Sequence, residues 1–167
     1  KGLQMTSKQS DMTILTALKG SGATFNIENG NINVEASKLK AFTFDATHSP
    51  DLFPPLAALA SYCEGVSAIK GVSRLIHKES DRANAIVAEF GKLGIRVEID
   101  DDFMKITGGK PHGGRVESHE DHRIAMAMAV TALKADGRVF IKDSQSVAKS
   151  YPVFFDDLRS LGTVVHE

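Results

Sequence analysis

Two stretches decide the fold of this chain: Lys78-Glu79-Ser80-Asp81-Arg82 and Asp121-His122-Arg123. Each leads into a helical pattern, and each places an arginine where the first helical turn begins. A cation there opposes the helix dipole, so another group has to hold it in place. Because a helix N-terminus with an arginine fork is a strong receptor for phosphate or carboxylate, the two stretches predict a site for small anionic molecules.

The first stretch also belongs to an internal repeat. Lys8-Gln9-Ser10-Asp11 returns as Lys78-Glu79-Ser80-Asp81, an offset of 70 residues (78 minus 8), and Lys149 begins a third occurrence. Pro50-Asp51 before one apolar segment corresponds in the same way to Glu120-Asp121 before another. Repeats this long fall outside the common solenoid families, so each copy should be a unit of several elements. The pattern predicts about two full copies and the start of a third.

Within each copy, a helix is followed by a hairpin. The best-defined helix runs from Asp81 to Leu93 and stops at Gly94,. The hairpin behind it turns at Asp100-Asp101-Asp102, which lacks the Gly and Glu of a calcium loop,. The matching hairpin of the first copy turns at Asn29-Gly30, a strong two-residue turn signal,.

A second helix and a short strand complete each copy. The second helices begin at Leu52 and His122 and are apolar nearly all round, so they should be buried,. Short strands follow near Val66 to Ile69 and Val139 to Ile141. The fold class predicted for residues 1–167 is a single α/β domain with buried helices and sheets outside.

Composition limits the class of protein. The chain has 167 residues, 42% hydrophobic and 25% charged, with a formal net charge of -1, which fits one globular domain with a core,. The near-neutral balance argues against a general nucleic-acid or membrane-surface binder, and apolar stretches such as Ile124 to Leu133 are too short to span a bilayer. No signal peptide is visible and Cys63 is the single cysteine, so we expect a cytoplasmic protein with Cys63 in the core,. The chain opens on Lys1 rather than Met, which indicates a piece of a longer protein.

Four motifs match the pattern of a known family in order: Ser49-Pro50-Asp51, residues 78–82, residues 121–123 and Ala148-Lys149-Ser150-Tyr151-Pro152. From about Lys8 onward the chain resembles the C-terminal portion of the EPSP synthases (3-phosphoshikimate 1-carboxyvinyltransferases), which are enolpyruvyl transferases. The resemblance implies two domains, each built from three βαβαββ units as an inside-out α/β barrel-like fold, with the active site between them. This chain would be the phosphoenolpyruvate-side domain, without the N-terminal domain and the N-terminal strand that completes its third unit.

The family reaction moves the enolpyruvyl group of phosphoenolpyruvate onto the 5-hydroxyl of shikimate 3-phosphate and releases phosphate through a tetrahedral intermediate. Such chemistry needs cations for the phosphate and carboxylate, a base near the hydroxyl and an acid for the methylene carbon. The resemblance implies no metal and no cofactor. The partners it implies are these two small molecules and the N-terminal domain of the same polypeptide, with a monomeric full-length protein.

Three cations are candidates for binding phosphoenolpyruvate. Arg82 and Arg123 are expected to form a bidentate clamp, because both stand in the first turn of a helix,. The alternative for Arg82 is a surface salt bridge to Glu79 or Glu89. Lys149 matches a lysine of the family and would be a third phosphate contact, with an ordinary solvated lysine as the alternative.

Four residues are candidates for catalysis. The resemblance implies that Asp51 holds or deprotonates the 5-hydroxyl and that Lys78 touches the shikimate ring and the reaction centre. Asp51 could instead be a helix N-cap. Glu79 resembles the carboxylate that transfers a proton at the methylene carbon, with helix-start electrostatics as the alternative. His122 either orients the anion or donates a proton, and a structural role stays equally open.

Two further groups of residues are less informative. His112, His119 and His122 invite a zinc site, but the first two lie in a Gly-Pro-rich loop without a second ligand cluster, so we do not expect zinc,. Arg74 stands where many family members carry asparagine, which leaves a substrate contact by Arg74 open.

Two alternatives compete with this interpretation: the sister enolpyruvyl transferase that acts on UDP-N-acetylglucosamine, and a non-catalytic anion-binding domain of the same fold. Residues 78–82 and 148–152 fit the shikimate enzyme better. A non-catalytic domain is disfavoured because all five charged candidates are present, namely Asp51, Glu79, Arg82, Arg123 and Lys149. The isolated chain is expected to show no turnover, because half of the site would be missing.

Overall fold

The computed structural model describes residues 7–75 and 81–166. Its helices are α1 (Ile14–Gly20), α2 (Phe53–Ser61), α3 (Arg82–Lys92), α4 (His122–Ala132) and α5 (Phe154–Ser160), and 3-10 turns cover Ser10–Thr13, Pro50–Leu52, Val72–Leu75 and Ser144–Lys149. Its strands are β1 (Thr24–Glu28), β2 (Asn31–Glu35), β3 (Thr43–Asp45), β4 (Val66–Lys70), β5 (Arg96–Asp100), β6 (Phe103–Thr107), β7 (Gly114–Glu117) and β8 (Val139–Lys142).

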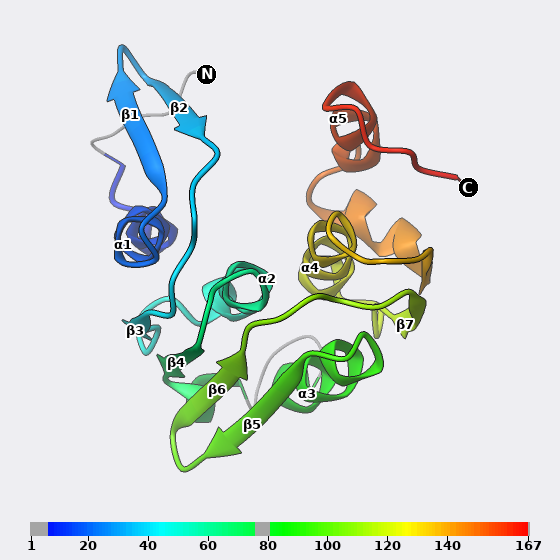
Figure 1. Ribbon diagram of the computed structural model, residues 1–167, viewed down its shortest axis with the longest axis horizontal. Coiled ribbons are helices and arrows are strands. Elements are labelled where there is room, and N and C mark those ends of the chain that lie inside the picture. Colours follow the sequence, from blue (N-terminus) through cyan, green and yellow to red (C-terminus); the bar gives the residue numbers. More distant parts are fainter. Residues whose placement is uncertain (1–6, 76–80, 167) are drawn as a thin grey trace.

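Within these described residues the strands form three sheets (Figure 1). The largest has the order β3-β4-β6-β5, in which β4 is parallel to β3 and antiparallel to β6. Its strands and helices follow one another as β3-α2-β4-α3-β5-β6, which is one βαβαββ unit. The hairpin β1-β2 and the parallel pair β7-β8 form the other two sheets. The α/β class is confirmed, whereas the number of copies stays a prediction.

The apolar helices α2 and α4 lie in the interior and pack against each other (Figure 1). Phe53 and Leu56 of α2 and Ile124 and Met128 of α4 are all 0% exposed. Each helix is the crossover of a parallel strand pair, α2 between β3 and β4 and α4 between β7 and β8, as parallel pairing requires,. The prediction that both second helices are buried is therefore confirmed.

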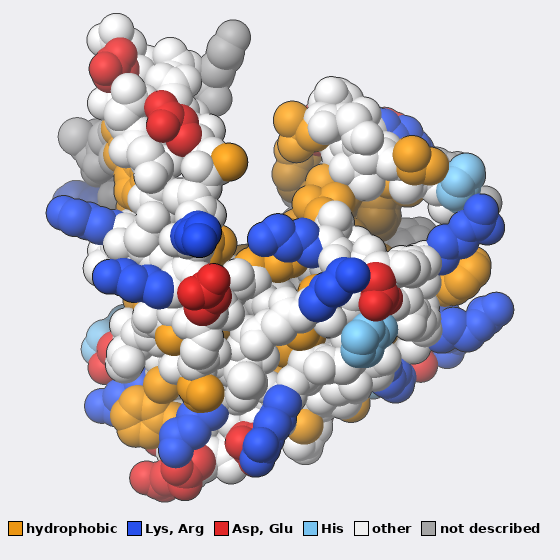
Figure 2. Space-filling model, in the orientation of Figure 1, with side chains coloured by type: hydrophobic (Ala, Val, Ile, Leu, Met, Phe, Trp, Pro, Cys, Tyr) orange, Lys and Arg blue, Asp and Glu red, His pale blue; other side chains and the backbone are white. Residues whose placement is uncertain are grey.

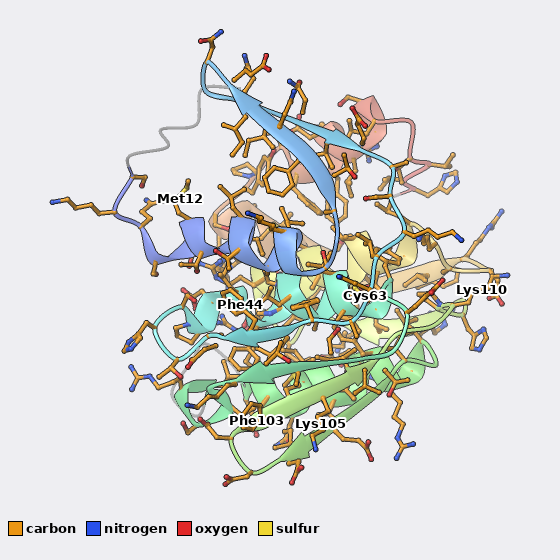
Figure 3. All side chains as sticks on the ribbon, turned by 60° about the vertical axis from the view of Figure 1, so that its left-hand side comes forward. Met12, Phe44, Cys63, Phe103, Lys105 and Lys110 are labelled. Atoms are coloured by element: carbon orange, nitrogen blue, oxygen red, sulfur yellow. The ribbon has the colours of Figure 1, made fainter. Side chains whose placement is uncertain are left out.

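Several local predictions are also confirmed. The hairpin β1-β2 turns at Asn29-Gly30, where both residues have positive φ, and the acidic segment forms the tip between β5 and β6. Helix α3 ends before Gly94, whose φ of 78° is accessible to glycine without strain,. Cys63 lies just after the end of α2 and is 3% exposed (Figure 3), where burial raises the pKa of its thiol.

Strands β3 and β7, which span only three and four residues, were not predicted from the sequence. Both strands precede the buried helices, so the structure has one strand more before each of these helices than the helix-strand-strand-helix-strand order predicts. Helix α2 begins at Phe53 rather than Leu52, because Pro50–Leu52 forms a 3-10 turn. In the part of the chain that the structure describes, no helix is both long and apolar enough to cross a membrane. Figure 2 shows an open notch between the β1-β2 side and the α5 side of the molecule.

Candidate anion-binding site

Helices α3 and α4 both begin with an aspartate cap followed by an arginine. Asp81 caps α3 by accepting a hydrogen bond from the Asn84 backbone N–H at 3.3 Å, and Arg82 is the first helical residue. Asp121 caps α4 by accepting from the Arg123 backbone N–H at 2.9 Å. The prediction that both arginines stand in a first helical turn is confirmed, and at each start the carboxylate offsets the unfavourable charge at that end of the dipole.

Asp51 brings the two arginines together from the turn before α2. Its Oδ1 accepts from Arg82 Nη1 at 2.8 Å and its Oδ2 accepts from Arg123 Nη2 at 3.2 Å. The Asp121 Oδ2 atom accepts from Arg82 Nε at 2.9 Å. Asp51 lies inside the Pro50–Leu52 turn and does not occupy a cap position, so the N-cap alternative is wrong. The starts of three helices therefore meet in one network of ions.

The network has an inner and an outer half. The side chains of Arg82 and Asp121 are 1% and 0% exposed, whereas those of Arg123 and Asp51 are 29% and 33% exposed. Burial lowers the pKa of Arg82, but the hydrogen bonds and charges of Asp121 and Asp51 outweigh it and leave the pKa above its ordinary value. Asp51 and Arg123 are thus the members of the network that a small molecule can reach.

Other predicted site residues lie near the start of α4. Lys149 ends the 3-10 turn after β8, and its Nζ donates to the Glu120 carbonyl oxygen at 2.7 Å, next to the cap of α4. His122 is the first residue of α4 and is 7% exposed, which leaves its structural and functional interpretations open.

Two of the predicted catalytic residues, Lys78 and Glu79, lie outside the described residues. Arg74 is exposed in the Val72–Leu75 turn.

The other two histidines of the predicted zinc group, His112 and His119, have carboxylate partners. His112 Nδ1 lies 3.1 Å from Asp136 Oδ2, and His119 Nε2 lies 2.9 Å from Glu89 Oε1. Among the described residues, no three histidine, cysteine or acidic side chains are grouped so that they could hold a metal ion. Glu89 pairs with His119, and Arg82 pairs with Asp51 and Asp121, so the alternative of a surface salt bridge from Arg82 to Glu89 is wrong. The alternative of a salt bridge to Glu79 falls outside the described residues.

Asp121 is the site residue that the sequence analysis missed. An aspartate directly before a helical pattern is an N-cap signal, so its local role was accessible from sequence. Its bond to Arg82, which precedes it by 39 residues, has no local signal. The Arg123 side chain is partly exposed at the start of α4, where the helix adds partial positive charge, and Lys149 lies beside the same helix start,. The arrangement is therefore suited to bind a small anion beside Arg123.

Comparisons with known proteins identify the family of this chain. Residues 1–158 match the family model described as EPSP synthase (3-phosphoshikimate 1-carboxyvinyltransferase). Relatives of that name include proteins from Thermococcus kodakarensis, 45% identical over 153 residues, and Pyrococcus abyssi, 46% identical over 151 residues. These alignments cover 92% and 90% of this chain but 38% and 37% of the relatives. The chain thus spans less than two fifths of the length of either.

Two solved structures also match most of this chain. An EPSP synthase from Acinetobacter baumannii matches with a TM-score of 0.77 and 30% identity, over 88% of this chain and 38% of that one. The enolpyruvyl transferase NikO from Streptomyces tendae matches with a TM-score of 0.73 and 23% identity, over 92% of this chain and 35% of that one. At that identity, the second match indicates a shared fold.

Proposed function

The chain belongs to the EPSP synthase family, and from this premise we propose that residues 1–167 form the phosphoenolpyruvate-side, C-terminal domain of a two-domain enolpyruvyl transferase. The proposed reaction transfers the enolpyruvyl group of phosphoenolpyruvate to the 5-hydroxyl of shikimate 3-phosphate and releases phosphate. Since the chain spans 38% of the relative from Thermococcus kodakarensis, the reaction is assigned to the full-length protein. We expect that protein to act as a cytoplasmic monomer without a cofactor. The observation that carries the proposal is the convergence of Asp51, Arg82 and Arg123.

Arg123 is the residue best placed to contact phosphoenolpyruvate. Its guanidinium is partly exposed and stands at the start of α4, and Lys149 reaches the same helix start. A phosphate or carboxylate can accept from the guanidinium in a bidentate arrangement, which a single oxygen of Asp51 cannot match. Binding of the anion would therefore displace Asp51 Oδ2 from Arg123.

That displacement would prepare Asp51 for its proposed role. Oδ1 would stay bonded to Arg82, which fixes the carboxylate, while Oδ2 would accept the hydrogen of the 5-hydroxyl as oxygen attacks the enolpyruvyl carbon,. Arg82 is 1% exposed. This burial supports an indirect role in catalysis, in which Arg82 contributes its positive charge and fixes the position of Asp51. Its direct contact with phosphoenolpyruvate stays a prediction.

Lys78, Glu79 and His122 complete the proposed catalytic set. Glu79, which precedes Arg82 by three residues in the sequence, would transfer a proton at the methylene carbon. Lys78 would lie beside shikimate 3-phosphate. His122, at the start of α4, would orient the anion or donate a proton.

The test is the reaction of the full-length protein with phosphoenolpyruvate and shikimate 3-phosphate, followed by phosphate release and by NMR of the enolpyruvyl ether. We expect both products in equal amounts, and Asp51→Asn should lower kcat about 100-fold or more. Asp45→Asn, which changes an exposed aspartate of β3, is the matched control. Product with UDP-N-acetylglucosamine instead would favour the sister enzyme, and anion binding without product would favour a non-catalytic domain. Full turnover by residues 1–167 alone would contradict the two-domain assignment.

A further inference from the structure

A second buried carboxylate, Glu89, lies on the same helix as Arg82. The two residues are two turns apart and face the same side of α3,. On that side, Arg82 bonds to Asp121 and Glu89 bonds to His119. Helix α3 is therefore fastened at two points to the connection between β7 and α4.

The side chain of Glu89 is 1% exposed and its two oxygens are fully used. Oε1 accepts from His119 Nε2 at 2.9 Å, Oε2 accepts from the Glu117 backbone N–H at 2.9 Å, and Lys92 Nζ lies 2.8 Å from both oxygens. Burial raises the pKa of Glu89, but the bonds from Lys92, Glu117 and His119 outweigh it and lower the pKa below its ordinary value. Because an ionised carboxylate can only accept, the hydrogen of this contact is on His119 Nε2.

The connection that Glu89 holds has an unfavourable backbone. His119 and Glu120 are consecutive non-glycine residues with φ of 53° and 56°, a region that L-residues adopt only when their surroundings impose it,. Two side chains impose it from outside the turn, Glu89 through His119 and Lys149 through the Glu120 carbonyl. The next residue is Asp121, which caps α4 and bonds to Arg82. Any relaxation of the turn would therefore move the Asp121 carboxylate, which accepts hydrogen bonds from the Arg82 side chain and from the Arg123 backbone N–H.

We infer that Glu89 and His119 are positioning residues, which set the spacing between the arginine-headed starts of α3 and α4 and thereby the affinity for phosphoenolpyruvate. They act through Asp121 and Arg123 and do not touch the substrate themselves. The inference rests on the proposed function for the identity of the anion. When Glu89 or His119 is replaced, the guanidinium groups of Arg82 and Arg123 would move apart. The Michaelis constant for phosphoenolpyruvate should therefore rise more than that for shikimate 3-phosphate.

The test uses full-length variants. Glu89→Gln and His119→Ala should raise the Michaelis constant for phosphoenolpyruvate about tenfold or more, because displacement by a fraction of an ångström weakens a bidentate contact. His119→Gln should restore most of the affinity, since its amide can donate to Glu89. Glu98→Gln is the matched control, because Glu98 pairs with Arg96 on the exposed strand β5. It should behave as the parent protein.

His119→Gly separates positioning from folding. Glycine adopts the left-handed backbone without strain but cannot reach Glu89, so this variant should keep its thermal unfolding midpoint close to that of the parent and still lose affinity for phosphoenolpyruvate. The inference is overturned if Glu89→Gln and His119→Ala leave this Michaelis constant unchanged. It is also overturned if both substrates are affected equally, or if His119→Gln is as impaired as His119→Ala.

Calorimetric titration with phosphoenolpyruvate and with inorganic phosphate separates this inference from the proposed function. If the parent protein makes no product but binds either anion, weaker binding by Glu89→Gln supports the positioning role while the reaction assignment fails. Equal binding by the parent and Glu89→Gln contradicts the positioning role. Failure of the parent to bind either anion contradicts both.

Discussion

The starts of α3 and α4 carry the same two residue types with opposite burial. At α3 the capping carboxylate of Asp81 is exposed and the arginine behind it is 1% exposed. At α4 the capping carboxylate of Asp121 is 0% exposed and the arginine behind it, Arg123, is 29% exposed. The inner arginine and the inner carboxylate bond to each other, and Asp51 joins the pair to the outer arginine.

This inversion divides one ionic network into a part that supports the fold and a part that meets solvent. A buried pair contributes little net stability when intact, but removing one partner strands a charge in the interior. An exposed pair contributes little in either case. We therefore expect that substitutions in the buried part lower the stability most, whereas substitutions in the exposed part lower the activity with little loss of stability.

Arg82→Ala should have the largest effect. It leaves Asp121, which is 0% exposed, without its guanidinium partner, and breaking a buried pair in this way costs about 3–5 kcal/mol,. Urea unfolding of the full-length protein measures the loss. Arg96→Ala, in an exposed pair with Glu98, is the control and should change the free energy of unfolding little. A loss at Arg82 no greater than at Arg96 would contradict the assignment of an inner half.

The two caps should differ. Asp81→Ala removes one helix cap and should cost about 1 kcal/mol,. Asp121→Ala removes a cap and also a buried partner of Arg82, so its cost should reach about 3 kcal/mol or more,. Unfolding in urea compares the two directly. Equal losses of unfolding free energy in the two variants would show that the burial of Asp121 adds nothing to the cost of its removal.

Acid should weaken the attachment of α3 more than the start of α4. The pKa of Glu89 is lower in the folded state than its ordinary value of 4.5, so its contribution to stability is present above that pH and is lost as the pH falls below it,. The equivalent place two turns along α4 is Ala129, which carries no charge. Unfolding free energies between about pH 7 and pH 3 should fall less steeply in Glu89→Gln than in the parent. Parallel curves would contradict the ionised state of Glu89.

Local features of this fold were accessible from the sequence. Asn29-Gly30 specifies a tight turn, Gly94 specifies a helix end, and a helix that is apolar nearly all round, such as α4, is expected to be buried,. Each prediction depends on neighbours within a few residues. Strands β3 and β7 were missed because they are short and are stabilised by pairing with β4 and β8 across a helix.

Some features of the candidate site could likewise be predicted from the sequence and others could not. That Arg82 and Arg123 head two helices was visible in the sequence, and family resemblance linked Asp51 to them. The bonds of Asp51 cross 31 and 72 residues of chain, so no local pattern reports them. From the sequence, Glu89 was considered only as a surface partner of Arg82. The helical periodicity indicates on which face of α3 Glu89 lies, but it does not indicate which loop packs against that face.

Arg123→Ala should have the smallest effect on stability and tests the central claim most directly. Its pair with Asp51 is partly exposed, so the free energy of unfolding should change by less than about 1 kcal/mol,. The decisive measurement is the Michaelis constant of the full-length variant for phosphoenolpyruvate. We predict an increase of about 100-fold, because a bidentate charge-assisted contact would be lost. An unchanged Michaelis constant and rate would contradict the assignment of Arg123 as the residue that binds phosphoenolpyruvate.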